Sequence, residues 1–191
     1  MAGFRESQTA KNLLLSYSAE AQARTRYNFF AVQAREEGYI QIANIFDETA
    51  NQEYEHGLRF FKFFNGGDLD ITGKFPAGVI RDTYTNLISS AELELYVHDQ
   101  MYKVFAEEAA QEGFQRAADT FHAINVAEKN HELMFRGLAE NLVSGRVFKR
   151  AEAVIWKCLS CGYLHEGNSP PDKCPACVKP PGYFEILKKN W

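Results

Sequence analysis

The sequence lacks any long apolar run, and its charges are not dominated by one sign. No apolar stretch approaches the roughly 18 residues of a membrane span, and the opening segment, MAGFRESQTAKN, lacks the apolar core of a signal peptide. The net charge is −4, with acidic and basic residues interspersed, so neither a nucleic-acid surface nor a membrane surface is indicated. We therefore expect a cytoplasmic protein whose partners include no nucleic acid and no membrane.

Cysteine is absent before position 158, and the four cysteines form two Cys-x-x-Cys pairs separated by twelve residues. In a cytoplasmic protein, clustered pairs of this kind bind metal more often than they form disulfides. Two such pairs can close a tetrahedral thiolate site. Thiolates suit both iron and zinc. Iron would make the site a one-electron carrier, and zinc would make it a structural ribbon. The predicted ligands are Cys158, Cys161, Cys174 and Cys177.

Proline and glycine are scarce between residues 8 and 144, where apolar residues recur every three or four positions. This period predicts helices, and the few interruptions divide the stretch into four. We expect Thr9 and Thr83 to be the N-caps of the first and third helices. The predicted helices span residues 9–37, 39–64, 82–112 and 114–143.

The composition changes after Arg146, where cysteine, proline and glycine become frequent and the helical period ends. The sequence therefore predicts an all-α four-helix bundle followed by a small metal domain of irregular or β structure. The segment 65–81 is long enough to be one end-to-end crossover of the bundle. The predicted divisions are residues 1–146 for the bundle, 147–153 for a linker and 154–191 for the small domain.

The helical part repeats itself. Glu53 matches Glu128 at an offset of 75 residues, whereas Glu20 matches Glu94 at an offset of 74. The third helix therefore holds one extra residue between Glu94 and Tyr102. An extra residue inside a helix is absorbed most simply as a π-bulge, a feature that is frequent at functional sites.

Two Glu-x-x-His motifs, in the second and fourth predicted helices, occupy equivalent positions of the repeat. Residues i and i+3 share one helix face, so each motif can offer an oxygen and a nitrogen to one site. With one inward glutamate from each of the other helices, this is the ligand set of a carboxylate-bridged di-iron or di-manganese bundle. A single motif would be explained by surface charge and a core histidine, but two copies in register favour metal. The predicted ligands are Glu20, Glu53, His56, Glu94, Glu128 and His131.

Tyr27 and Tyr102 lie two turns beyond Glu20 and Glu94 on the inward stripes. We expect their hydroxyls to donate hydrogen bonds to ligand carboxylates. The alternative is that both are ordinary core tyrosines. His98 lies one turn after Glu94 and is better placed as a solvated or supporting residue than as a ligand.

These residues together resemble rubrerythrin over essentially the whole chain, in the order in which that family has them. The matching features are Glu20, Glu53-x-x-His56, AGVI, Glu94, Glu128-x-x-His131, CGYLHEG and CPAC. The resemblance implies a ferritin-like bundle with a di-iron centre and a rubredoxin-like domain with one iron on four cysteines. It also implies a homodimer or larger assembly that reduces hydrogen peroxide to water. The electrons would come from NAD(P)H through rubredoxin or a separate reductase.

The resemblance also implies a role for each ligand. Glu20 and Glu94 would each bind one iron as terminal ligands, and Glu53 and Glu128 would bridge the two. His131 would bind the iron on the side of Glu94.

The sequence departs from the family at one position. In rubrerythrins, the iron near Glu20 moves between a histidine at position 56 and an extra glutamate as the centre is reduced and oxidised. That glutamate lies three residues after the one matching Glu94, where this sequence has Val97. We expect an apolar cavity at Val97 and an iron that stays on His56. The alternative is that His98 or Glu92 supplies the missing ligand. Glu92 precedes Glu94 by two residues and should face away, so His98 is the better substitute.

Two other functions stay open from the sequence. A ferritin-like ferroxidase would use the bundle in the same way, but it has no need of a four-cysteine electron carrier. A non-catalytic metal-binding protein would hold zinc in its tail. The visible spectrum separates these readings, because ferric iron on four thiolates is red and a zinc site is colourless.

Overall fold

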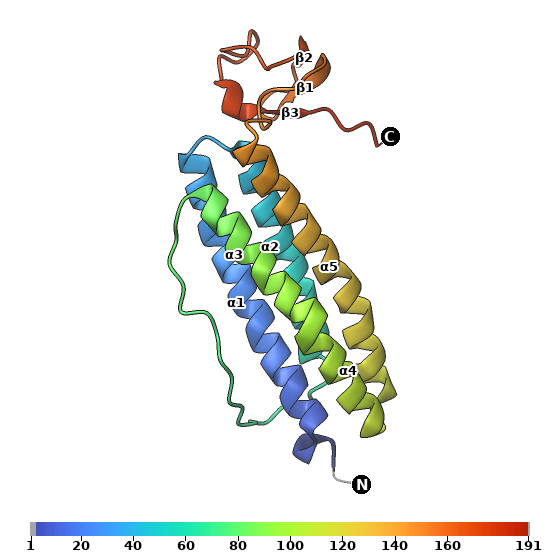
Figure 1. Cartoon of the computed structure of the whole chain (residues 1–191). Coiled ribbons are helices and arrows are strands. Elements are labelled where there is room, and N and C mark those ends of the chain that lie inside the picture. Colours follow the sequence, from blue (N-terminus) through green and yellow to red (C-terminus); the bar gives the residue numbers. More distant parts are fainter. Residues whose placement is uncertain (1–2, 191) are drawn as a thin grey trace.

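The bundle is built from four antiparallel helical segments, of which the third changes its helical winding midway (Figure 1). The computed structural model describes residues 3–190. The helices are α1 (Gln8–Glu36), α2 (Ile40–Phe61), α3 (Thr83–Tyr96), α4 (Tyr102–Gln111) and α5 (Gln115–Val143). Residues Val97–Met101 form a π-helical turn that joins α3 to α4. The predicted four-helix bundle is therefore confirmed, and so is the predicted π-bulge.

The segment between α2 and α3 runs along the outside of the bundle from one end to the other (Figure 1). It packs over α1 and α3, and it returns the chain to the end at which α1 stops. The sequence predicted this single long crossover at 65–81. In the structure, α2 ends at Phe61 rather than at residue 64, because Phe63 and Phe64 bond back in tight turns to Phe60 and Phe61.

The helices bury two separate apolar cores. One contains Tyr27, Phe46 and Phe135, and the other contains Phe60 and Phe121, each with surrounding alanines. In every long helix, the residues of one core are followed along the chain by a buried glutamate and then by residues of the other core. The bundle therefore consists of two hydrophobic layers with a layer of buried carboxylates between them.

Two N-cap predictions are wrong. The caps are Ser7, whose hydroxyl accepts from the Ala10 N–H at 3.1 Å, and Asp82, whose carboxylate accepts from the Thr85 N–H at 2.9 Å. Thr9 and Thr83 lie inside the first turns instead. The side chain of an N-cap residue accepts from a free N–H two or three residues further along the chain, so the N-cap must precede the first helical residue. Thr9 and Thr83 already lie within the helices.

The free N–H groups of these two threonines bond to glutamates of the opposite repeat. The Thr9 N–H donates to the Glu112 carboxylate at 2.8 Å, and the Thr83 N–H donates to the Glu37 carboxylate at 3.1 Å. Glu37 and Glu112 are equivalent in the repeat, so each half of the bundle caps the other. Burial alone would raise the pKa of Glu112, but the hydrogen bonds from Thr9 lower it. An anionic group at a helix N-terminus is also favoured by the helix dipole.

The tail forms a three-stranded antiparallel sheet in the order β2-β1-β3. The strands are β1 (Val154–Cys158), β2 (Leu164–Gly167) and β3 (Phe184–Ile186). Trp156 and Phe184 form its core together with Cys158 and Cys174. The predicted small domain thus contains a short sheet together with the four clustered cysteines. It lies at the end of the bundle (Figure 1).

The tail rests on the turn between α1 and α2. Tyr39 stacks on Phe148 with ring centroids 6.0 Å apart, and Gly182 approaches the Gly38 carbonyl so closely that a Cβ at position 182 would not fit. These contacts fix the tail beyond the end of the bundle, away from the carboxylate layer.

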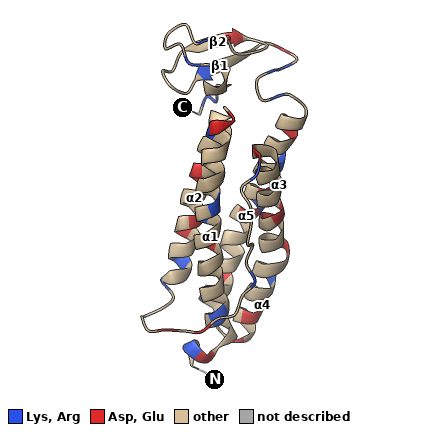
Figure 2. Ribbon diagram, turned by 90° about the vertical axis from the view of Figure 1, so that its left-hand side faces the viewer, with Lys and Arg blue, Asp and Glu red and all other residues tan. Residues whose placement is uncertain are grey.

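Charges of both signs are distributed along the bundle and the tail (Figure 2). Among the described residues, no helix is both long and apolar enough to cross a membrane.

Glu112→Ala should lower the free energy of unfolding by about 1–2 kcal/mol, because the substitution leaves the N–H groups of Gln8 and Thr9 without their acceptor. Urea denaturation of variants with equal metal content measures the change. Glu107→Ala, at an exposed position of the same helix, is the matched control and should stay within about 0.5 kcal/mol of the parent. Equal losses in the two variants would contradict the capping role.

Candidate metal centres

The carboxylate layer brings all six predicted ligands of the bundle together. Two groups of side chains have ligand atoms within 4.8 Å of one another, and both groups contain Glu53 and Glu128. The four glutamates and His131 are buried, and the side chain of His56 is 14 % exposed. The first group is Glu20, Glu53, His56 and Glu128, and the second is Glu53, Glu94, Glu128 and His131.

The Glu-x-x-His spacing places each histidine between the two shared glutamates. His56 Nδ1 lies 2.9 Å from an oxygen of Glu53 and 2.9 Å from an oxygen of Glu128. His131 Nδ1 lies 2.9 Å from Glu128 and 3.1 Å from Glu53. Both carboxylates therefore face both halves of the layer, which is the arrangement that a bridging ligand requires.

Electrostatics show that this cluster needs positive charge. Burial, followed by the charges of Glu128 and Glu53, raises the pKa of Glu20 well above its usual value. Burial and the same two neighbours also raise the pKa of Glu94. Without a cation, burial and the neighbouring carboxylates therefore favour the protonated form of these two carboxyls.

The pKa values of the two histidines are also raised, but the cause is the neighbouring carboxylates rather than burial. Burial favours the neutral ring, but the close contacts with the Glu128 and Glu53 carboxylates raise the pKa of His56 to about 11 and that of His131 to about 10. The pKa of Glu128 falls to about 2, because the bonds from both histidines outweigh its burial. The imidazolium rings thus stand where two cations would sit.

Two buried oxygen atoms support the fit to metal directly. Oε1 of Glu53 and Oε1 of Glu128 make no hydrogen bond of acceptable geometry to the described residues, although each lies within 3.1 Å of a histidine nitrogen. A buried carboxylate oxygen without a partner is costly. Four carboxylates match the charge of two divalent cations, and the donor set of oxygen and imidazole nitrogen suits iron.

Tyr27 and Tyr102 contact the terminal glutamates across the repeat. The Tyr27 hydroxyl donates to Glu94, and the Tyr102 hydroxyl donates to Glu20. Burial, followed by the charges of these glutamates, raises the pKa of both tyrosines, which keeps them protonated donors. The structure thus places both tyrosines where the sequence expected them, and their influence on bound metal stays a prediction.

Gln52 is a supporting residue that the sequence analysis missed. His131 Nε2 lies 2.9 Å from the Gln52 carbonyl oxygen, so the ring can donate to it and present Nδ1 to the shared glutamates. A second hydrogen bond of this kind fixes the ring and tautomer of a ligand histidine. The repeat gave no hint, because the position equivalent to Gln52 is Ala127. The chemistry of the ligand could have predicted such a residue, because a buried histidine that binds metal through one nitrogen needs a hydrogen-bond acceptor for the N–H of the other.

His98 does not join either ligand group. It is buried on the π-helical turn, and its Nε2 lies 2.7 Å from Glu132, which also accepts from Arg136. The alternative of His98 as a substitute ligand is therefore not supported by its position. Val97, the first residue of that turn, is buried beside Glu20 and Glu94.

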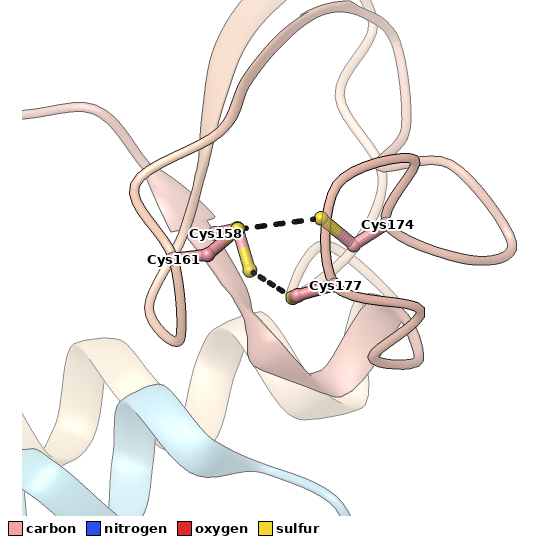
Figure 3. A group of neighbouring side chains, drawn as sticks. All are labelled: Cys158, Cys161, Cys174 and Cys177. Atoms are coloured by element: carbon pink, nitrogen blue, oxygen red, sulfur yellow. Dashed lines mark hydrogen bonds between the residues drawn. The ribbon is translucent and has the colours of Figure 1, made fainter.

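The four cysteine sulfurs converge on one point between two loops of the tail (Figure 3). Sγ of Cys158 lies 3.7 Å from that of Cys177, and Sγ of Cys161 lies 3.6 Å from that of Cys174. A disulfide needs about 2.05 Å, whereas a tetrahedron with metal–sulfur bonds of about 2.3 Å separates its sulfurs by about 3.8 Å. The spacing fits a metal and excludes disulfides in this arrangement.

The two knuckles have the same backbone geometry. The residue after each second cysteine has a left-handed conformation, with φ of 78° at Gly162 and 56° at Val178. The turn lets the backbone N–H of Lys179 reach the Cys177 sulfur and lower the pKa of that thiol to about 7. Thiolate is the metal-binding form of cysteine. The hydrogen bond from Lys179 therefore favours the metal-binding form at Cys177.

Comparison with known proteins identifies the family. A family model described as Rubrerythrin matches residues 11–139, and a model described as Rubrerythrin, rubredoxin-like domain, matches residues 156–185. The chain belongs to the rubrerythrin family. The expected resemblance is confirmed, and with it a rubrerythrin di-iron site in the bundle and a rubredoxin-like four-cysteine site in the tail.

Relatives match over the full length. The chain is 49 % identical to a rubrerythrin of Nitratidesulfovibrio vulgaris, with both chains covered completely. It is 45 % identical to a rubrerythrin of Porphyromonas gingivalis, covering 97 % of this chain and 92 % of the relative. A structure of nigerythrin in its mixed-valence state aligns with a TM-score of 0.64 and 28 % identity, covering 95 % of this chain and 90 % of that one.

Val178→Gly should stabilise the rubredoxin-like knuckle by about 1 kcal/mol, because a β-branched residue is strained at positive φ and glycine is not. The Val178 side chain is 75 % exposed, so little packing is lost. The rate of metal loss from the tail to a chelator measures the effect. Gly162→Val, which introduces the same strain into the other knuckle, should speed metal loss. Unchanged rates in both variants would contradict this explanation.

Glu53→Ala should remove both metal ions of the bundle and spare the tail, because Glu53 belongs to both ligand groups of the rubrerythrin site. Cys174→Ser should remove only the tail metal. Metal analysis after anaerobic loading with iron measures the content, with Glu55→Ala, at an exposed position of the same helix, as control. A Glu53→Ala protein that keeps a full complement of bundle metal would refute the shared-ligand assignment.

Proposed function

We propose that the chain is a cytoplasmic non-haem di-iron peroxidase that reduces hydrogen peroxide to water as a defence against oxidative stress. The observation that carries the proposal is the pair Glu53 and Glu128, whose carboxylates face two ligand groups at once. A shared pair of carboxylates holds two metals close enough to act together on one two-electron substrate. The four-cysteine site on the same chain supports electron delivery rather than storage.

The residues divide the work between them. Glu53 and Glu128 bridge the two positions, Glu20 and His56 complete one, and Glu94 and His131 complete the other. The hydroxyls of Tyr27 and Tyr102 hold the terminal glutamates in place. Bound iron supplies redox chemistry at both sites: two electrons from the bundle pair for each peroxide, and single electrons through the tail.

The two apolar cores above and below the layer keep bulk water from the ligands. Cleavage of one hydrogen peroxide consumes two electrons and two protons and gives two molecules of water. The pKa values of Glu20, Glu94, His56 and His131 are all raised in the absence of a cation, so metal binding is expected to release protons.

The position of the tail favours a homodimer or larger assembly. Glu20 lies 16 residues before the end of α1, which corresponds to about 24 Å along the helix axis, and the tail sits beyond that end. Electron tunnelling weakens steeply with distance. The tail of one copy therefore serves the bundle of a neighbouring copy in this proposal, with rubredoxin or an NAD(P)H-linked reductase as the electron donor to the tail.

A ferroxidase function is the second candidate. The bundle has the ferritin-like fold on which it would rest, but the four-cysteine site has no task in iron oxidation. A zinc-filled tail would favour this second function, and a red, iron-filled tail would favour the peroxidase.

Cys158→Ser protein should consume one equivalent of hydrogen peroxide after chemical reduction but should not turn over with NADH and a reductase. Glu128→Ala protein should show neither reaction, because it lacks the bundle metals. In a 1:1 mixture of refolded subunits, half of the dimers pair one copy of each variant, and turnover should recover to about a quarter of the parent rate in a two-fold assembly.

The unmixed variants are the controls for this experiment. A mixture that stays inactive while the parent turns over would contradict electron delivery between subunits. A parent chain loaded with iron that consumes no peroxide would overturn the peroxidase function itself.

A further inference from the structure

A cavity of about 320 Å³ lies directly beside the carboxylate layer. Glu20 and Glu94 reach its inner end, together with Val97. Its walls come from α1, α3, the π-helical turn and α4, and the crossover lines it with Lys74, Phe75 and Pro76. The cavity is the structural counterpart of the apolar space that the sequence predicted at Val97.

The walls of this cavity are suited to an organic group. Leu15, Ala19, Met101 and Phe105 contribute apolar surface. The volume falls in the range of small-molecule sites, about 300–1,000 Å³. Arg26, Lys74 and Gln100 also line the cavity, but most of its lining surface is apolar. Hydrogen peroxide is far smaller than this space and would leave most of the apolar surface uncovered. A bulkier molecule with an apolar body would fill the same space and bury that body against the walls.

The inner end of the cavity is the polar part. The carboxylates of Glu20 and Glu94 belong to the two different ligand groups, and both are held in place by tyrosines. A molecule with an apolar body and one polar, reducible end would place that end at the ligand groups. A carboxylate side chain at position 97 would extend into the space beside Glu20 and Glu94, whereas the shorter, apolar side chain of Val97 leaves that space free.

We propose that this cavity binds the organic group of an alkyl or aryl hydroperoxide, so that the chain reduces organic hydroperoxides as well as hydrogen peroxide. The inference rests on the proposed peroxidase function. In this reaction the O–O bond of ROOH breaks, two electrons come from the reduced iron pair, and two protons are taken up. The products are the alcohol ROH and one water.

Binding tests the cavity without catalysis. The alcohol product of cumene hydroperoxide, 2-phenylpropan-2-ol, is titrated into the full-length chain loaded with diamagnetic zinc. NMR should show saturable shifts of the Met101 and Ala19 methyl signals at millimolar or lower concentration, and Ala19→Phe should abolish the Met101 shift. Ala21→Phe, at an exposed position of the same helix outside this cavity, should leave it intact. No saturable shift at these methyls would overturn the inference, whether or not the chain reduces hydrogen peroxide.

Turnover of the iron-loaded chain tests the substrate class. The ratio of kcat/KM for cumene hydroperoxide to that for hydrogen peroxide should fall at least about tenfold in Ala19→Phe, because several buried CH₂ equivalents are worth about fourfold each. Ala19→Leu, a milder change, should lower the ratio less, and Ala21→Phe should not change it.

An unchanged ratio in Ala19→Phe would overturn the inference while leaving the peroxidase function standing. If the unaltered chain binds the alcohol but does not reduce hydrogen peroxide, the proposed peroxidase function is overturned instead.

Discussion

The bundle depends on one constraint: four carboxylates are buried between two hydrophobic cores and must be balanced by positive charge. An isolated buried carboxylate is expensive, and four of them within one layer repel one another. Without metal, the raised pKa values of Glu20, Glu94, His56 and His131 all favour added protons, which supply positive charge to the layer. Two divalent cations would meet this constraint better, because they would also engage the unpaired oxygens of Glu53 and Glu128.

The internal repeat distributes this support between the halves. A tyrosine of each half donates a hydrogen bond to the terminal glutamate of the other half. A glutamate of each half accepts hydrogen bonds from the N-terminus of the first helix of the other half. Neither half can complete its own metal position or its own cap. The chemistry therefore requires the whole bundle.

The two metal positions are nevertheless unequal. His131 has Gln52 on its outer nitrogen, and its side chain is 3 % exposed. The position equivalent to Gln52 is Ala127, and the side chain of His56 is 14 % exposed. The side of His56 is thus the less constrained one. The cavity beside the π-helical turn is lined by the terminal glutamates of both positions.

Much of this was readable from the sequence, because periodicity and ligand chemistry act locally. The helices, the extra residue that becomes the π-helical turn, and the grouping of Glu53 with His56 follow from spacing along one helix. The N-caps were misjudged by one or two residues because threonine, serine and aspartate compete for the same role. Gln52 and the close approach of Gly182 to Gly38 depend on how helices and tail pack, which no local pattern encodes.

The most direct test of the account is anomalous X-ray scattering at the iron edge from crystals of the iron-loaded chain. The account predicts one peak among the four cysteine sulfurs and two peaks in the bundle, with carboxylate oxygens of both Glu53 and Glu128 in contact with each of the two. A single bundle peak, or two peaks that do not share these glutamates, would contradict it.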